Sequence, residues 1–369
     1  MTSRFVATTA TLLASLSLGT AASAQYIQLT DGDDIFADSG NTFIAGFVGD
    51  GSDAFAVISG NDVPAIQKIE DAGGANTVTT TVDSTQLIGL TGNDAYAPAF
   101  FDLSGDTILS GEITTDQIYG FSTVGINGVS IEGSEPSLDA FIGGTGPGVF
   151  FGAVDAITGE TFFYETDTDS IIANTSVNTF ETVVTDTELA ALSGDDIISG
   201  LAASDGVLFF GNASGSSPLV EGIYAFDTNT GTGEVLVTAD QADAILGGTN
   251  GINPTNTGFF AAPNGDIFFF DSGFDAILSF DPDDPLGTLG FVLTQAEILA
   301  GPANSGLGTS SSPVIGITDL GWVDGELAFL IGSDSSVTGA IAGIYAIPEP
   351  ASAALLGLGG LAMLRRRSA

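Results

Sequence analysis

The chain contains neither cysteine nor histidine, and each absence excludes a class of chemistry. Without cysteine there can be no disulfide, no thiolate metal ligand and no thiol nucleophile. Without histidine there can be no Ser-His-Asp or Cys-His catalytic arrangement, and the usual proton shuttle near neutral pH is missing. Any catalysis or metal binding must therefore use carboxylates, hydroxyls or hard cations such as calcium.

Basic residues are almost as scarce. The 369 residues include five Lys and Arg against 46 Asp and Glu, which gives a formal net charge of −41. Four of the five cations lie close to the chain ends, so Lys68 stands alone in the central part. Nucleic-acid binding draws on Lys and Arg that displace counterions, and we therefore expect no nucleic-acid partner. The acidity suggests a saline or calcium-containing exterior that screens the charge. A surface kept soluble by its negative charge is the alternative interpretation, and it is favoured.

The N-terminal segment, residues 1–24, has the three parts of a secretion signal in order. Arg4 is followed by an apolar stretch from Val6 to Leu18, and Ala22-Ser23-Ala24 then precedes Gln25. This A-x-A arrangement predicts cleavage between Ala24 and Gln25, and thus export. A buried N-terminal helix is the alternative interpretation.

The C-terminal segment, residues 348–369, also has three parts in order. Pro348-Glu349-Pro350 precedes a charge-free run over 351–364, and Arg365-Arg366-Arg367 follows directly. The apolar run is short for a bilayer span and would also suit a core helix. The arginine cluster favours a membrane helix, because positive residues hold a terminus on the cytoplasmic side.

This tail resembles the PEP-CTERM sorting signal of bacterial exported proteins. Pro348, Glu349 and Pro350 match the motif residue by residue, and the three arginines match its basic stop. The resemblance implies an exosortase-type sorting enzyme as partner, a membrane contact before processing, and a location in the cell envelope, on the cell surface or in an extracellular polysaccharide matrix. It covers only about the last 22 residues, so it implies an address and no activity.

A repeat runs through the region between these two segments. Related segments of the Ile-Tyr-Ala-Phe type begin at residues 66, 118, 171, 223, 277 and 344. The steps between them are 52, 53, 52, 54 and 67 residues, which predicts six units of a little over 50 residues.

Each unit combines hairpins with a short helix. The dipeptides Asp205-Gly206, Asn264-Gly265 and Asp324-Gly325 precede aromatic and β-branched runs, and such dipeptides favour tight hairpin turns. Four capping-box signatures predict helix starts: Asp83 with Gln86, Thr185 with Glu188, Thr238 with Gln241, and Thr294 with Glu297.

Four strands and one short helix, repeated six times, predict an all-β six-bladed β-propeller over residues 25–347, with short helices between blades. The segment Tyr26–Thr30 resembles Gly290–Thr294 and precedes the first capping box by one repeat. We therefore expect Tyr26–Leu29 to close the ring by pairing with Ile344–Ile347, which hides both sheet edges. A parallel β-helix or other solenoid and a two-domain sandwich are the alternatives.

Three aspartates are candidate site residues. Asp102, Asp155 and Asp319 lie on expected inner strands, where they could hold Ca²⁺ in a central channel or act as acid and base. Their offsets from the following turn glycine are three, four and six, so they do not share one register. Ordinary strand-end aspartates are the alternative interpretation.

Other fragments are incomplete versions of known sites. Isolated Asp-Gly fragments resemble calcium-binding nonapeptide turns but lack tandem copies, so helix-entry and turn roles are favoured. They are Asp31-Gly32-Asp33-Asp34, Gly92-Asn93-Asp94 and Gly194-Asp195-Asp196. Asp167-Thr168-Asp169 begins like an EF-hand loop without its Gly or closing Glu, and Gly143–Gly148 is Gly-rich without a following Lys. Trp322 would suit carbohydrate stacking, but core packing is favoured.

These observations lead to a hypothesis of a non-enzymatic, exported propeller scaffold that binds envelope components or polysaccharide, with divalent cations as bridges. A cation-dependent propeller hydrolase or lyase that uses channel carboxylates is the first alternative. A self-assembling structural layer protein is the second.

Overall fold

The computed structural model describes residues 26–36, 43–59, 64–92, 96–125, 128–144, 148–194, 197–212, 221–248, 251–302, 317–333 and 342–348. The expected secretion signal with its cleavage site at Ala22, Ala24 and Gln25 lies outside the described residues, as do Glu349, Pro350, the apolar run 351–364 and Arg365 to Arg367. Pro348 is the one residue of the expected sorting motif that the structure includes.

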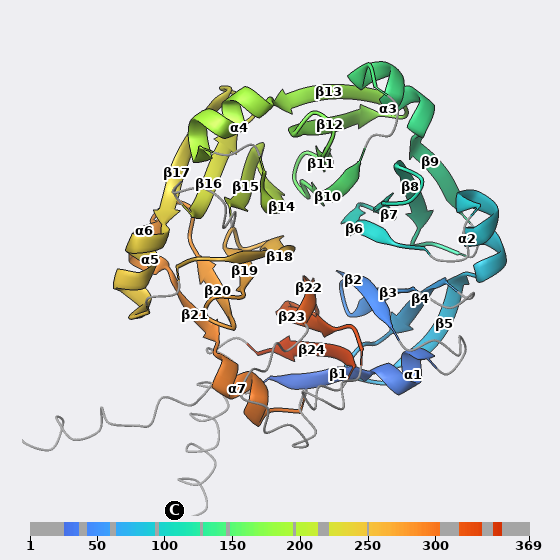
Figure 1. Cartoon of the computed structure of the whole chain (residues 1–369). Helices are drawn as coiled ribbons and strands as arrows, with labels where there is room; N and C mark the ends of the chain where they lie inside the picture. The colour runs from blue at the N-terminus through green and yellow to red at the C-terminus, as the bar shows by residue number, and fades with distance from the viewer. Residues whose placement is uncertain are drawn as a thin grey trace, which may run out of the picture.

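Six four-stranded antiparallel sheets form a ring, so the predicted six-bladed β-propeller is confirmed (Figure 1). Blade 1 is β2 (Ile44–Asp50), β3 (Asp53–Ile58), β4 (Ala65–Glu70) and β5 (Thr77–Val82). Blade 2 is β6 (Pro98–Ser104), β7 (Thr107–Glu112), β8 (Gln117–Ser122) and β9 (Val129–Gly133). Blade 3 is β10 (Val149–Val154), β11 (Thr161–Glu165), β12 (Ser170–Ser176) and β13 (Thr179–Val184).

The other three blades follow the same plan from the axis outward. Blade 4 is β14 (Ser199–Ser204), β15 (Val207–Asn212), β16 (Gly222–Asp227) and β17 (Thr232–Thr238). Blade 5 is β18 (Pro254–Ala261), β19 (Ile267–Asp271), β20 (Ala276–Phe280) and β21 (Gly290–Leu293). Blade 6 is β22 (Ile317–Val323), β23 (Glu326–Ile331), β24 (Gly343–Ile347) and, as its outer strand, β1 (Ile27–Asp31). The repeated segments that begin at 66, 118, 171, 223, 277 and 344 all lie in third strands.

The ring closes through its first and last strands, as the sequence predicted. β1 pairs antiparallel with β24, with Ile27 opposite Ala346 and Asp31 opposite Gly343. Tyr26 strengthens this closure, because its ring packs edge-on against Phe329 at 5.1 Å between centroids and its hydroxyl donates to the Ile298 carbonyl at 2.6 Å. The exposed edges of an open sheet are thereby paired.

Two of the three predicted tight turns have the expected geometry. Asp205-Gly206 and Asp324-Gly325 have positive φ at both residues, 52° and 76° for the first pair and 51° and 82° for the second, as a tight hairpin turn requires. At Asn264-Gly265 only Gly265 has positive φ, 96°, and its N–H donates to the Ala262 carbonyl, so this hairpin uses a longer turn.

The helices of the described residues are short and follow the outer strands, except for α6, which lies between β20 and β21. They are α1 (Gly32–Phe36), α2 (Ser84–Thr91), α3 (Glu135–Ile142), α4 (Asp186–Ser193), α5 (Ala239–Leu246), α6 (Pro285–Thr288) and α7 (Gln295–Ala300). All four predicted capping boxes form, at α2, α4, α5 and α7. At α6, Pro285 starts a helical turn that the Asp284 carboxylate caps.

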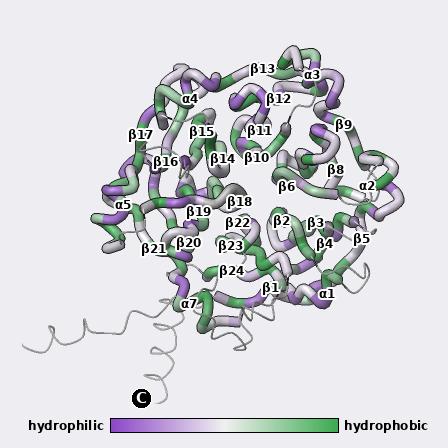
Figure 2. The backbone as a smooth tube through the Cα atoms, in the orientation of Figure 1, coloured by the Kyte–Doolittle hydropathy of each residue, from purple (hydrophilic) through white to green (hydrophobic). Residues whose placement is uncertain are grey.

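The blades pack against one another through aromatic and aliphatic side chains. One cluster joins Phe162 and Tyr164 of blade 3 to Phe210 and Tyr224 of blade 4, and the Phe210 and Tyr224 rings stack at 5.8 Å between centroids. Figure 2 shows hydrophilic stretches around the rim helices α4 and α5, away from the blade interiors. The core therefore lies between the blades, and this packing leaves the axis of the ring to the inner strands.

The ring has two distinct faces. We call turn face the one that carries the turns between first and second strands, such as 205–206 and 324–325, and loop face the opposite one. Ile347 lies opposite Leu327, directly after turn 324–325, and Ile27 lies opposite Ala346. The chain therefore enters the ring before β1 and leaves it after β24 on the same turn face.

None of the helices within the described residues is long and apolar enough to cross a membrane.

Candidate ligand cavity at the centre of the ring

A cavity of about 550 Å³ lies where the six inner strands converge. β2, β6, β10, β14, β18 and β22 all contribute to its wall. Each of these strands has a register shift near its start, so its first residues depart from regular pairing with the second strand. The lining includes the turn residues Gly51, Gly265 and Gly325, and the cavity therefore reaches the turn face.

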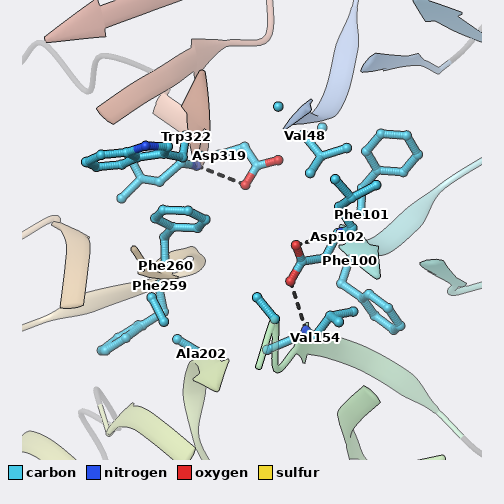
Figure 3. Close-up of a pocket in the computed structure, with 18 of the residues that line it drawn as sticks. Val48, Phe100, Phe101, Asp102, Val154, Ala202, Phe259, Phe260, Asp319 and Trp322 are labelled. Atoms are coloured by element: carbon cyan, nitrogen blue, oxygen red, sulfur yellow. Dashed lines mark hydrogen bonds between the residues drawn. The ribbon is translucent and has the colours of Figure 1, made fainter. Parts of the chain in front are cut away.

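Most of the cavity wall is apolar. Figure 3 shows the rings of Phe101, Phe260 and Trp322 around it, together with the aliphatic side chains of Val48 and Val154. A volume of this size with apolar walls and few polar groups is typical of a small-molecule site.

Asp102 is one of two carboxylates that point into this space (Figure 3). Its Oδ2 accepts from the Val154 N–H of the next blade at 2.8 Å, and its Oδ1 accepts from the Leu103 N–H at 2.8 Å. Burial raises the pKa of Asp102 to about 6, although both hydrogen bonds act to lower it. The carboxyl is thus held in one orientation while its charge is poorly compensated.

Asp319 is the second carboxylate, and it is held in the same way. Its Oδ2 accepts from the Phe47 N–H of blade 1 at 2.9 Å, and its Oδ1 accepts from the Leu320 N–H at 2.9 Å. Burial raises the pKa of Asp319 well above its ordinary value, and the negative charge of Asp102 acts in the same direction. The charge of Asp102 thus adds a smaller effect to that of burial at Asp319.

The strand pairing explains why both point inward. Asp102 lies two residues before Ser104, the last paired residue of β6, and Asp319 lies four residues before Val323, the last of β22. Both separations are even, so both side chains lie on the same side of equivalent strands. The sequence offsets concealed this, because Gly105 is the first residue of its turn and Gly325 is the second.

Asp155, the third candidate, has a different position. It follows β10 and is buried, where its Oδ1 accepts from the Ile157 and Thr158 N–H groups at 2.8 and 3.1 Å. Its Oδ2 accepts from the Gly206 N–H of the next blade at 2.7 Å. Burial acts to raise the pKa of Asp155, but these hydrogen bonds together lower it. Asp155 therefore joins two turns and does not line the cavity.

Sequence reasoning missed another set of buried acids at the loop face. Glu112, Glu165 and Asp271 end the second strands of blades 2, 3 and 5, and all three are fully buried. The Glu165 carboxylate accepts from the Gly148, Asp167 and Thr168 N–H groups and so fixes the turn that follows it. The sequence does hold a sign of these acids, because an aspartate follows each of them four residues later, at Asp116, Asp169 and Asp275. In the structure these three aspartates have positive φ in the turn.

The incomplete motifs have turn and helix-entry geometry where the structure describes them. The Asp33 N–H donates to the Asp31 carboxylate at the start of α1. Gly92, Gly143 and Gly194 follow α2, α3 and α4 with φ of 67°, 74° and 76°, the left-handed conformation of a helix C-terminus. The residues 93–95, 145–147 and 195–196 lie outside the described part. Asp167-Thr168-Asp169 is the β11–β12 turn that Glu165 fixes.

Trp322 packs against the core and also faces the cavity, and carbohydrate stacking stays a prediction. Its ring is half-buried and packs near Phe268, with 6.4 Å between ring centroids, and it also lines the cavity. Among the residues that the structure describes, no three His, Cys, Asp or Glu side chains gather in a way that could hold a metal ion.

No protein-family model matches the chain, and no curated protein matches its sequence. Solved structures are similar to it in fold. Luciferin-regenerating enzyme aligns with a TM-score of 0.52 at 12% identity, over 88% of this chain and 96% of its own. A catalytically inactive virginiamycin B lyase from Staphylococcus aureus, solved with quinupristin, aligns with a TM-score of 0.48 at 14% identity, over 88% and 99% of the two chains. At such identities the likeness shows the propeller fold alone.

Proposed function

We propose that the protein is an exported, non-enzymatic scaffold of the cell envelope or extracellular matrix, whose acidic propeller binds envelope components or polysaccharide. One observation carries this proposal. The ring begins with β1 at Ile27 and ends with β24 at Ile347, so it fills the interval between the expected cleavage after Ala24 and the motif that begins at Pro348. A folded unit that fits between two targeting segments supports their interpretation as removable addresses.

The position of the two ends supports an oriented scaffold. Both ends of the ring leave from the turn face, so a tail held at a membrane would place the turn face toward it and present the loop face outward.

The loop face carries several carboxylates on neighbouring blades. Burial raises the pKa of Asp116 to about 6, and the negative charges of Glu135, Glu112 and Asp167 add to this. Such a surface suits contacts bridged by divalent cations.

The sorting proposal is tested by expressing the full chain in a bacterium that carries an exosortase-type enzyme. Mass spectrometry is expected to find a chain that begins at Gln25 in the envelope or matrix fraction. The double variant Glu349→Ala with Pro350→Ala is expected to keep its tail and stay in the membrane fraction, whereas Asp106→Ala, which removes an exposed turn carboxylate, is processed normally. A cytoplasmic chain that keeps Met1, or equal processing of the motif variant, contradicts the proposal.

Calcium is a separate part of the proposal. A chelator is expected to lower the melting temperature of the purified protein, because a ligand that binds only the folded state stabilises it by about 3 kcal/mol at a hundred times its Kd. Calcium added back should restore the transition, and magnesium serves as the control ion. An unchanged melting temperature would remove calcium and leave the sorting proposal in place.

A cation-dependent hydrolase or lyase is the second candidate, and the observation that favours it is the pair Asp102 and Asp319 in the cavity, with raised pKa values suited to proton transfer. This candidate predicts that the protein cleaves a lactone or polysaccharide in a calcium-dependent reaction. The variants Asp102→Asn and Asp319→Asn should both lose that activity.

A further inference from the structure

We propose that the central cavity binds an organic ammonium ion, with Asp102 and Asp319 as counter-ions and the aromatic wall around its apolar body. This goes beyond the scaffold proposal and does not depend on export or sorting. It starts from an imbalance of charge in the cavity wall.

The cavity lining holds carboxylates and no cation. Asp102, Asp319 and the exposed rim residue Asp50 are its ionisable groups. Lys68 is the one cation in the described part of the chain, and it is engaged away from the lining with Asp53 at 2.8 Å and Glu70 at 3.5 Å. A buried charge without a partner is costly, so a bound cation would remove a cost that the fold otherwise carries.

Each carboxylate has capacity for such a partner. The oxygens of Asp102 accept one N–H each, and so do those of Asp319, whereas an ionised carboxylate has about four acceptor sites. The backbone donors fix the side chains in place, so the remaining acceptor sites are oriented before a ligand arrives. Pre-orientation lowers the entropy cost of binding.

The wall chemistry decides which kind of cation fits. Calcium takes six to eight oxygen ligands, and two carboxylates that already accept N–H groups supply few of them. The rings of Trp322 and Phe260 lie near Asp319 in Figure 3, and the faces of such rings attract an ammonium group while their area buries apolar atoms. An ammonium ion with an aromatic or alkyl body matches both the charge and the walls.

Ammonium binding in the cavity should depend on pH. Burial raises the pKa of Asp102 to about 6 and that of Asp319 well above its ordinary value, so both gain protons as the pH falls and lose the charge that attracts the ligand. Ammonium binding is therefore expected to be strongest in neutral to mildly alkaline solution and to release protons there.

The test is calorimetric titration of the purified protein with 2-phenylethylamine, using propylbenzene as the neutral isostere. At pH 7.5 the amine is expected to bind at least about tenfold more tightly than propylbenzene, and about tenfold less tightly at pH 5 than at pH 7.5. Asp102→Asn and Asp319→Asn are each expected to weaken amine binding about tenfold, with propylbenzene unaffected. Asp106→Asn, an exposed carboxylate in the same blade as Asp102, should leave amine binding unchanged.

Equal binding of the amine and propylbenzene overturns the role of charge, and so does amine binding that is the same at both pH values. Calcium binding that both Asp→Asn variants abolish, and that excludes the amine, assigns the cavity to a metal instead. The isostere and pH comparisons use the unaltered chain, so they decide the matter even where a variant does not fold.

Discussion

Asp102 lies on the inner strand of blade 2 and Asp155 directly follows the inner strand of blade 3, yet they belong to two different regions of the molecule. Asp155 lies in the turn region, where three backbone N–H groups from two blades surround its carboxylate and lower its pKa. Asp102 lies in the cavity region, where two N–H groups do not offset burial and its pKa rises to about 6. The same side chain is thus a structural anion in one region and a poorly compensated one in the other.

The number of backbone donors alone does not separate the two roles. Burial raises the pKa of Asp271 to about 6 although the Phe274, Asn253 and Gly273 N–H groups act to lower it. Asp271, however, lies in a filled turn, whereas Asp102 and Asp319 face open volume. A carboxyl group that faces a cavity, and whose hydrogen bonds do not offset the effect of burial on its pKa, is therefore the feature that indicates a ligand.

Replacing Asp155 has the largest expected effect. Asp155→Ala leaves three N–H groups without their acceptor, including that of Gly206 in the neighbouring blade. Each unsatisfied buried donor costs about 1–3 kcal/mol, so we expect a loss of about 3 kcal/mol in the free energy of unfolding at pH 7. Urea denaturation measures it. Asp167→Ala, an exposed acid in another turn of blade 3, is the control, and an equal effect of the two would abolish the distinction between the regions.

Much of the fold could be predicted from the sequence because its signals are local and repeated. The capping box at Thr185 and Glu188 needs only four residues, and the turn at Asp205-Gly206 needs only two. The ring closure followed from the likeness of Tyr26–Thr30 to Gly290–Thr294, since equivalent residues occupy equivalent strands.

The site could be predicted only in part, because it depends on what surrounds each residue. Asp102, Asp155 and Asp319 were all recognised as inner-strand acids, but only pairing to the adjacent strand shows which ones reach the cavity. One donor to each of Asp102 and Asp319 comes from the next blade, in one case from blade 1 across the ring closure. No spacing in the sequence shows that a distant backbone N–H lies beside a given carboxylate.

A smaller effect, with a definite sign, comes from pH. The pKa of Asp102 rises from about 3.9 in the unfolded chain to about 6 in the folded one, so the folded state keeps a proton that the unfolded chain releases. This contribution to stability is complete below about pH 4 and is lost as the pH rises to about 6. Relative to the unaltered chain, Asp102→Asn should therefore gain on the order of 1 kcal/mol between pH 5 and pH 7.5. Asp319→Asn should change in the same direction.

Asp155→Asn should change in the opposite direction, because a lowered pKa contributes stability that is present above about pH 4 and lost as the pH falls. Urea denaturation measures both signs, between about pH 5 and pH 7.5 for Asp102→Asn and from about pH 5 down to about pH 3 for Asp155→Asn. Asp106→Asn is the exposed control in the blade of Asp102. Parallel pH profiles for Asp102→Asn and the unaltered chain would mean that the cavity carboxyl is compensated after all. The ammonium proposal would then lose the charge imbalance from which it starts, while the turn role of Asp155 would stand on its hydrogen bonds alone.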